Sequence, residues 1–214
     1  MKSVLIGKEN AGEIDNMFHG AGNLLMEFDN KSCCGGDHLI HALREKEVEI
    51  SEADWRNLSM ISLINQVMLG HHLFLRTELP LLGELIKKIM RLHGNKHKEL
   101  IELYRLFCYL KNELEQHLFD EEELFFPFII KYEKTNSIDA LKQAKPFIDK
   151  LESDHDLVSK ILKQIRVLTS NYTLPGDACR TFALTFIMLN KLELKMENHI
   201  HAENHFLFPR IRNS

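Results

Sequence analysis

Apolar residues recur at steps of three and four along most of the chain, which is the spacing of the buried face of an α-helix. Four such stripes follow one another, and they run over residues 68–89, 103–128, 148–165 and 189–206. The second stripe places Leu124 on its buried face. The pattern therefore predicts four long amphipathic helices.

Short segments of helix-ending residues separate the stripes. His93-Gly94-Asn95 ends the first stripe, Thr135-Asn136-Ser137 ends the second, and the segment 171–177 with its Pro-Gly pair ends the third. Four long helices joined by short connections predict an all-α fold, an antiparallel up-down four-helix bundle spanning residues 51–214. Residues 1–50 predict a small N-terminal helical segment around a glycine-containing turn, which is too short to bury a core of its own.

Charge and composition exclude several classes of function. Lys and Arg total 27 against 31 for Asp and Glu, so the net charge is −4 and nucleic acid is not an expected partner. No apolar run approaches the roughly 20 residues of a membrane helix, and the four cysteines lack the spacing of a secreted disulfide framework. We therefore expect a cytoplasmic protein with reduced thiols and no membrane contact.

Each of the four stripes contains one histidine at a core position, and two stripes add a glutamate four residues later. Burial of an unpaired polar group costs about 1–3 kcal/mol, so such positions need a reason. A step of four residues places both side chains on one face of a helix. The six inward-facing residues are His72, His117, Glu121, His155, His199 and Glu203.

The spacing of the histidines predicts that these side chains share one level. His72 and His117 are 45 residues apart around the turn at Gly94, and His155 and His199 are 44 apart around the next hairpin turn. The segments HLFDEEELFFP and HIHAENHFLFP also match in their His, Glu, Phe and Pro positions, so the second hairpin repeats the first. We therefore expect four imidazoles and two carboxylates in one layer.

Such a set favours iron or manganese. Six ligands exceed the four of structural zinc, and the imidazoles disfavour calcium and magnesium. Divided over two metals, each ion takes two histidines and one oxygen from each bridging glutamate. This number of ligands per ion indicates a dinuclear iron centre with an oxo bridge and open positions for a small ligand. The alternative is structural, with each histidine hydrogen-bonded inside the core, but it would require the buried glutamates to be protonated or paired with charged histidines.

Further histidines and an adjacent pair of cysteines lie outside these six positions. His93 lies in the register of the first helix but about 31 Å from His72 along it, so it is not counted as a ligand. His201 and His205 face away from the stripe. Cys33 and Cys34 form either an ordinary turn or a thiol pair for redox chemistry or iron transfer.

Several motifs resemble a known family. The His-x3-Glu segments ending in Phe-Pro resemble hemerythrin-like HHE cation-binding domains. With Cys33-Cys34-Gly35-Gly36 in front and the further segments His71–Pro80 and Leu92–Gly94, the whole chain resembles the iron-sulfur cluster repair di-iron proteins of the ScdA/YtfE group. The resemblance implies a non-haem di-iron centre in a four-helix bundle, with the family's ligands on the six residues named above. It also implies a role under nitrosative or oxidative stress.

Together with the predicted metal centre, the resemblance implies a di-iron protein that restores damaged iron-sulfur clusters by donating iron, by binding nitric oxide and reducing it to N2O, or by both. Damaged iron-sulfur proteins would be transient partners, and nitric oxide or O2 the small ligands. A hemerythrin-like O2 or NO sensor or carrier, and a metal-free helical interaction module, are the alternatives. Whether the protein is an enzyme, its electron donor and its oligomeric state stay open.

Overall fold

The structure is a computed structural model that describes residues 52–214, and this part of the chain is helical throughout, without strands. The predicted N-terminal helical segment, its boundary near residue 50 and the pair Cys33-Cys34 lie outside the described residues. Those expectations therefore stay predictions.

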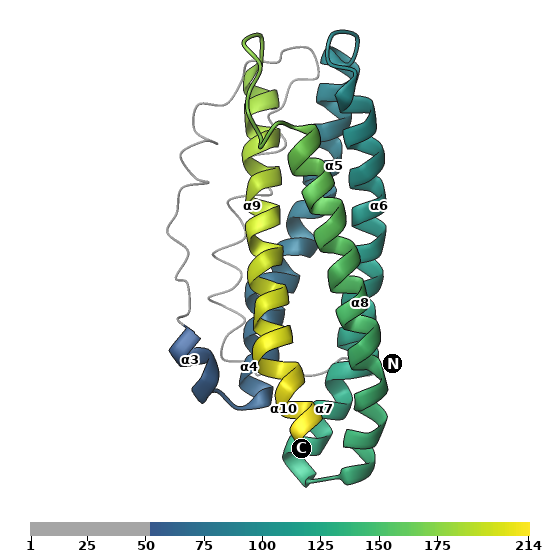
Figure 1. Ribbon diagram of the computed structural model, residues 1–214, viewed down its shortest axis with the longest axis vertical. Helices are drawn as coiled ribbons and strands as arrows, with labels where there is room; N and C mark the ends of the chain where they lie inside the picture. Colours follow the sequence, from purple (N-terminus) through teal and green to yellow (C-terminus); the bar gives the residue numbers. More distant parts are fainter. Residues whose placement is uncertain (1–51) are drawn as a thin grey trace. The chain divides into compact units, whose positions relative to one another are not determined.

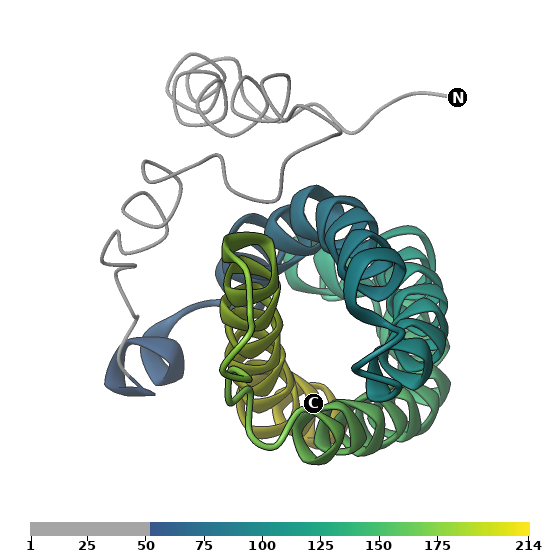
Figure 2. The ribbon, with the colours of Figure 1, turned by 90° about the horizontal axis from the view of Figure 1, so that it is seen from above.

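Four long helices form a bundle. Their axes run alongside one another and alternate in direction (Figure 1), and seen end-on they stand in a ring (Figure 2). In that ring α5 and α8 each pack against both α6 and α9. The bundle helices are α5 (Leu73–His93), α6 (Glu99–Phe119), α8 (Ile138–Leu168) and α9 (Arg180–Ala202). The predicted all-α antiparallel bundle is confirmed.

Three shorter helices continue long ones. They are α4 (Met60–Val67), α7 (Phe126–Thr135) and α10 (Phe208–Asn213), which lie at one end of the bundle in Figure 1, and the separate helix α3 (Glu52–Asn57) precedes α4. A short π-helix, in which the turn is wider by one residue than in an α-helix, joins α4 to α5, α6 to α7 and α9 to α10. The π-helices are η1 (Met68–His72), η2 (Asp120–Phe125) and η3 (Glu203–Leu207).

Local sequence signals explain where the helices begin and end. The Ser59 hydroxyl accepts a hydrogen bond from the Ser62 amide at the start of α4, and Ser137 does the same for Ala140 at the start of α8. Asn136 ends α7 in the left-handed conformation with φ 51°, which asparagine tolerates better than most residues. The predicted helix break at Thr135-Asn136-Ser137 is confirmed.

One position of the predicted core is wrong. Leu124 is 40% exposed, whereas the next residues, Phe125 and Phe126, are buried. The π-helix η2 adds a residue to the turn after Glu121, so the following side chains rotate relative to the α-helical spacing. The phenylalanines then enter a core shared with α4, α8 and α10.

The α3–α4 segment is held by polar contacts from the two extension helices. Glu133 of α7 accepts hydrogen bonds from the amides of Met60 and Ile61, at 2.8 and 2.7 Å, where α4 begins. Arg210 of α10 donates to the carbonyl of Arg56 at 2.7 Å, and also to those of Trp55 and Leu58. Among the described residues, no helix combines the length and apolar character that crossing a membrane requires.

Candidate metal centre

The structure brings together all six side chains that the sequence singled out. Each is buried, with at most 1% of its surface exposed. They come from four segments of the chain. His72 ends η1 and His155 lies within α8, while the pair His117/Glu121 lies where α6 meets η2 and the pair His199/Glu203 lies where α9 meets η3. The predicted single layer of imidazoles and carboxylates is therefore present.

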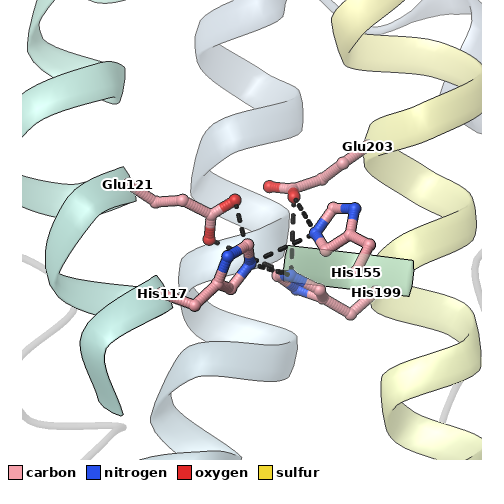
Figure 3. A group of neighbouring side chains, drawn as sticks. All are labelled: His117, Glu121, His155, His199 and Glu203. Carbon is pink, nitrogen blue, oxygen red and sulfur yellow. Dashed lines mark hydrogen bonds and ion pairs between the residues drawn. The ribbon is translucent and has the colours of Figure 1, made fainter. Parts of the chain in front are cut away.

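Five of the six side chains form the closest group. His117, Glu121, His155, His199 and Glu203 each offer one atom within 4.8 Å of all the others. Nε2 of His117 lies 3.1 Å from Nε2 of His155 and 3.4 Å from Nε2 of His199. Figure 3 shows the two carboxylates above this group of imidazoles, turned toward one another. Glu203 Oε2 lies 3.3 Å from Nε2 of His155 and 3.4 Å from Nε2 of His199.

His72 joins this group through a carboxylate. Its Nε2 lies 3.1 Å from Glu121 Oε2, while Glu121 Oε1 lies 3.3 Å from Nε2 of His117. The His72 ring lies 5.3 Å from the ring of His199, centroid to centroid. Glu121 thus stands between histidines of two helices, which is the placement that bridging a pair of cations would require.

The π-helices position three of these residues. His72 is the last residue of η1, Glu121 is the second of η2, and Glu203 is the first of η3. π-Helical turns often occur at functional sites because the extra residue redirects neighbouring side chains. Periodicity did not predict these turns. A usable signal was the step of five residues from each glutamate to the phenylalanine before proline, Phe126 and Phe208, both of which are buried.

His72 is held from two sides. Its Nδ1 donates to Glu122 Oε1 at 2.9 Å, and the ring of Phe126 stacks on it at 5.8 Å with an interplanar angle of 19°. Glu122 Oε2 accepts from Arg76 at 2.8 Å. Burial opposes ionisation of Glu122, but the hydrogen bonds from His72 and Arg76 outweigh it and lower the pKa of Glu122. An ionised Glu122 can only accept, so the Nε2 lone pair of His72 faces the cluster.

His155 is held in the same way in the second hairpin. Its Nδ1 lies 2.9 Å from Asn204 Oδ1, and the ring of Phe208 stacks on it at 5.8 Å with an angle of 10°. With the amide oxygen accepting, the Nε2 lone pair of His155 also points inward. An outer partner that fixes the tautomer in this way is usual for metal-bound histidine.

The remaining two histidines have different neighbours. Nδ1 of His117 lies 3.8 Å from Asp154 Oδ2, and Lys150 contacts the same oxygen at 2.9 Å. His117 and Lys150 lower the pKa of Asp154 against the opposing effect of partial burial. The ring of His199 has the buried His71 beside it, at 5.6 Å.

Sequence reasoning missed Asp154, Asn204 and His71 as neighbours of the cluster. A signal was available in each case. Asp154 precedes His155, His71 precedes His72, and Asn204 follows Glu203 directly. Their importance depends on contacts with other helices, which periodicity does not reveal.

The electrostatics of the cluster fit a bound cation. Burial, and then the charge of Glu203, raise the pKa of Glu121 well above its ordinary value. Burial lowers the pKa of both His117 and His199, so these imidazoles do not supply the compensating positive charge. His72 Nε2 and all four carboxylate oxygens of the two glutamates are buried without a hydrogen-bond partner. Orphaned polar atoms of this kind, aimed at one point, are the arrangement that a metal ion satisfies.

The other histidines lie elsewhere. His93 ends α5 and contacts Cys179 at the start of α9, at 3.2 Å between Nε2 and Sγ, which is the opposite end of both helices from the cluster. His201 and His205 are exposed, with their rings 4.6 Å apart. The exclusion of all three from the cluster agrees with the interpretation of the sequence.

Comparison with known proteins agrees with this geometry. The hemerythrin HHE cation binding domain matches residues 63–211, which contain all of the bundle, and the chain belongs to this family. The fold and the buried His/Glu cluster thus define a cation-binding protein of the hemerythrin class.

Individual relatives indicate which family within the hemerythrin class the chain belongs to. The chain is 31% identical to the iron-sulfur cluster repair protein ScdA of Staphylococcus haemolyticus, over 83% of this chain and 86% of that protein. It is 30% identical to the iron-sulfur cluster repair protein YtfE of Escherichia coli K12, over 93% of this chain and 94% of that protein. A probable iron-sulfur cluster repair protein of Haemophilus influenzae is 28% identical over 91% of this chain. Within the hemerythrin class, the chain belongs to the iron-sulfur cluster repair proteins.

Proposed function

We propose that this chain is a di-iron protein that repairs iron-sulfur clusters damaged by nitrosative or oxidative stress. The observation that carries the proposal is the buried layer of four imidazoles and two carboxylates, whose donor atoms converge without other partners. The names of the relatives indicate the process, repair of iron-sulfur clusters, and the buried cluster indicates the chemistry, binding of iron. Damaged iron-sulfur proteins are the proposed transient partners. The cytoplasmic location stays a prediction from the sequence.

The donor set suits two iron ions held by His72, His117, His155 and His199, with Glu121 and Glu203 bridging. Four imidazole nitrogens and four carboxylate oxygens would give each ion two nitrogens and two oxygens, which leaves positions for a small ligand. Bound iron would supply nitric oxide binding and reduction, or a pool of transferable Fe²⁺. Imidazoles hold Fe²⁺ less tightly than thiolates do, so this chain suits iron that must leave again.

The chain's own residues would perform three tasks in this function. The outer partners Glu122 and Asn204 hold two imidazoles with Nε2 inward. The stacked Phe126 and Phe208 fix the planes of those rings and exclude water from that side. Burial and the charge of Glu203 disfavour an ionised Glu121 in the empty site, and so favour retention of cations until transfer.

Iron analysis comes first among the tests. We expect about two irons per chain in protein purified anaerobically from iron-replete cells, and a Mössbauer spectrum of a coupled pair, which also tests the predicted oxo bridge. Absence of iron would support the metal-free interaction module instead.

Two assays then test the repair function. The reduced protein is mixed with nitric oxide and N2O is measured, while a parallel sample is incubated with a hydratase whose iron-sulfur cluster has been damaged. We expect N2O formation, hydratase reactivation, or both. Failure of both assays with iron-loaded protein would reject the proposal.

A sensor or carrier of O2 or nitric oxide is the second candidate, because the hemerythrin class match alone does not specify repair. A stable, reversible O2 adduct of the reduced protein, without hydratase reactivation, would favour it.

A further inference from the structure

The two halves of the metal centre have matched outer positions. In each repeat, the residue directly after the bridging glutamate approaches Nδ1 of the first histidine of its own hairpin. Glu122 reaches His72 at 2.9 Å, and Asn204 reaches His155 at 2.9 Å. A phenylalanine stacks on each of these histidines at 5.8 Å. The geometry is therefore the same on both sides, and the chemical difference is a carboxylate against an amide.

A second pair of matched positions shows the same difference. The residue directly before the first histidine of each hairpin lies beside the second histidine of the other hairpin. Asp154 lies 3.8 Å from His117, between Oδ2 and Nδ1, and the His71 ring lies 5.6 Å from the ring of His199. Both histidines of the first hairpin thus have a carboxylate neighbour. The two histidines of the second hairpin have an amide, from Asn204, and an imidazole, from His71, at the matching positions.

A cationic side chain lies beside each of the two outer carboxylates. Arg76 donates to Glu122 at 2.8 Å, and Lys150 donates to Asp154 at 2.9 Å. Of the two carboxylates, Glu122 lies within hydrogen-bond distance of an Nδ1, and a carboxylate that accepts this proton increases electron density on Nε2 of His72 and so strengthens it as a metal ligand. An amide oxygen does this less because it carries no charge.

We propose that this difference makes the first hairpin the anchoring side and the second hairpin the releasing side of the iron site. Glu122 strengthens His72 as a ligand and Asn204 leaves His155 weaker, so Asn204 sets how readily Fe²⁺ is given up. Both are positioning residues, because each acts through a histidine. The inference rests on the proposed iron site and adds which hairpin holds iron more weakly and so releases it.

Two isosteric variants test the assignment in opposite directions. Asn204→Asp gives His155 a carboxylate partner, and Glu122→Gln gives His72 an amide partner. The full chain is loaded with Fe²⁺ anaerobically, its iron content is measured, and the rate of iron loss to excess ferrous chelator is followed by absorbance. We expect Asn204→Asp to slow release about tenfold and Glu122→Gln to accelerate it about tenfold.

Controls separate this effect from structural damage. Glu123→Gln removes the same charge from the neighbouring exposed residue and should leave the rate unchanged. The double variant Glu122→Gln/Asn204→Asp should return the rate toward that of the parent protein, which loss of structure would not do.

The possible results distinguish this inference from the proposed function. A parent protein that binds no iron would reject the proposed function and the inference together. A parent protein with two irons, and single variants whose rates are unchanged or shift in the same direction, would overturn the inference alone.

Discussion

In the first hairpin the ring of His72 lies between Glu122 and Phe126, and in the second hairpin the ring of His155 lies between Asn204 and Phe208. The stacking distance and the hydrogen-bond length are equal in the two halves. The repeat has thus kept the contacts that aim an imidazole at the centre, while the charge behind the imidazole differs. The orientation of each imidazole and the charge of its outer partner are therefore separate properties of this site.

The two hairpins also hold the α3–α4 segment by opposite means. The first hairpin continues into α7, where Glu133 accepts two amide hydrogen bonds at the start of α4. The second continues into α10, where Arg210 donates to carbonyls around the end of α3. An anion thus satisfies amides that begin one helix, and a cation satisfies carbonyls that end another, as the partial charges of helix ends favour.

The two glutamates that are proposed to bridge the irons should give the largest effect. Glu121→Ala and Glu203→Ala each remove two orphaned oxygens that face the cluster, so we expect either variant to fall well below two irons per chain or to lose the coupled Mössbauer spectrum. The effects should be similar, because the two residues occupy equivalent positions. Retention of both irons with an unchanged spectrum would reject the bridging assignment.

The stacked phenylalanines should come next. Phe126 and Phe208 are buried, and Phe126→Ala and Phe208→Ala should each lower the free energy of unfolding by about 3–5 kcal/mol, measured by urea denaturation of the metal-free protein. Iron content should fall as well, because each ring orients a histidine. A large loss for one variant alone would contradict the equivalence of the two halves.

The pH dependence of the stability of the metal-free protein should show the free-energy cost of burying the ionised Glu121 carboxylate. The pKa of Glu121 is higher in the folded state than its ordinary value of 4.5, so the folded protein holds this proton more tightly than the unfolded chain. The contribution of Glu121 to the free energy of unfolding should therefore fall as pH rises above about 4.5, by at most roughly 1.4 kcal/mol per pH unit.

Glu121→Gln isolates this contribution. We expect the variant to gain stability relative to the parent protein as pH rises from 5 to 7 without metal. His117 and His199 act in the opposite sense, since their lowered pKa favours the folded state at higher pH, but burial, the main cause of that lowering, is common to both proteins. A constant difference between the two proteins across this range would contradict the assignment.

The anchors of the α3–α4 segment should have the smallest effect. Glu133→Gln keeps one acceptor for Met60 and Ile61 but removes the charge, so we expect a loss of about 1 kcal/mol in urea denaturation. Iron content should not change, because Glu133 is not among the residues of the cluster. Loss of iron in this variant would show that the segment contributes to the site.

Much of the architecture follows from local pattern. Steps of three and four give the helices, and caps such as Ser137 and turns such as the one at Gly94 give their ends. The level of the six polar residues was also predictable, because antiparallel hairpins of nearly equal length bring His72 opposite His117, and His155 opposite His199. The cluster therefore follows from sequence spacing alone.

Tertiary structure decided what surrounds that cluster. The wider turns after His117 and His199, the exposure of Leu124, and the partners Glu122, Asn204 and Asp154 follow from packing between helices. The physical reason is that periodicity is a local property of one helix, whereas these contacts join residues far apart in the sequence. Periodicity reports which face of one helix is apolar, whereas an outer hydrogen bond depends on which side chain of another helix arrives within about 3 Å of a ring nitrogen.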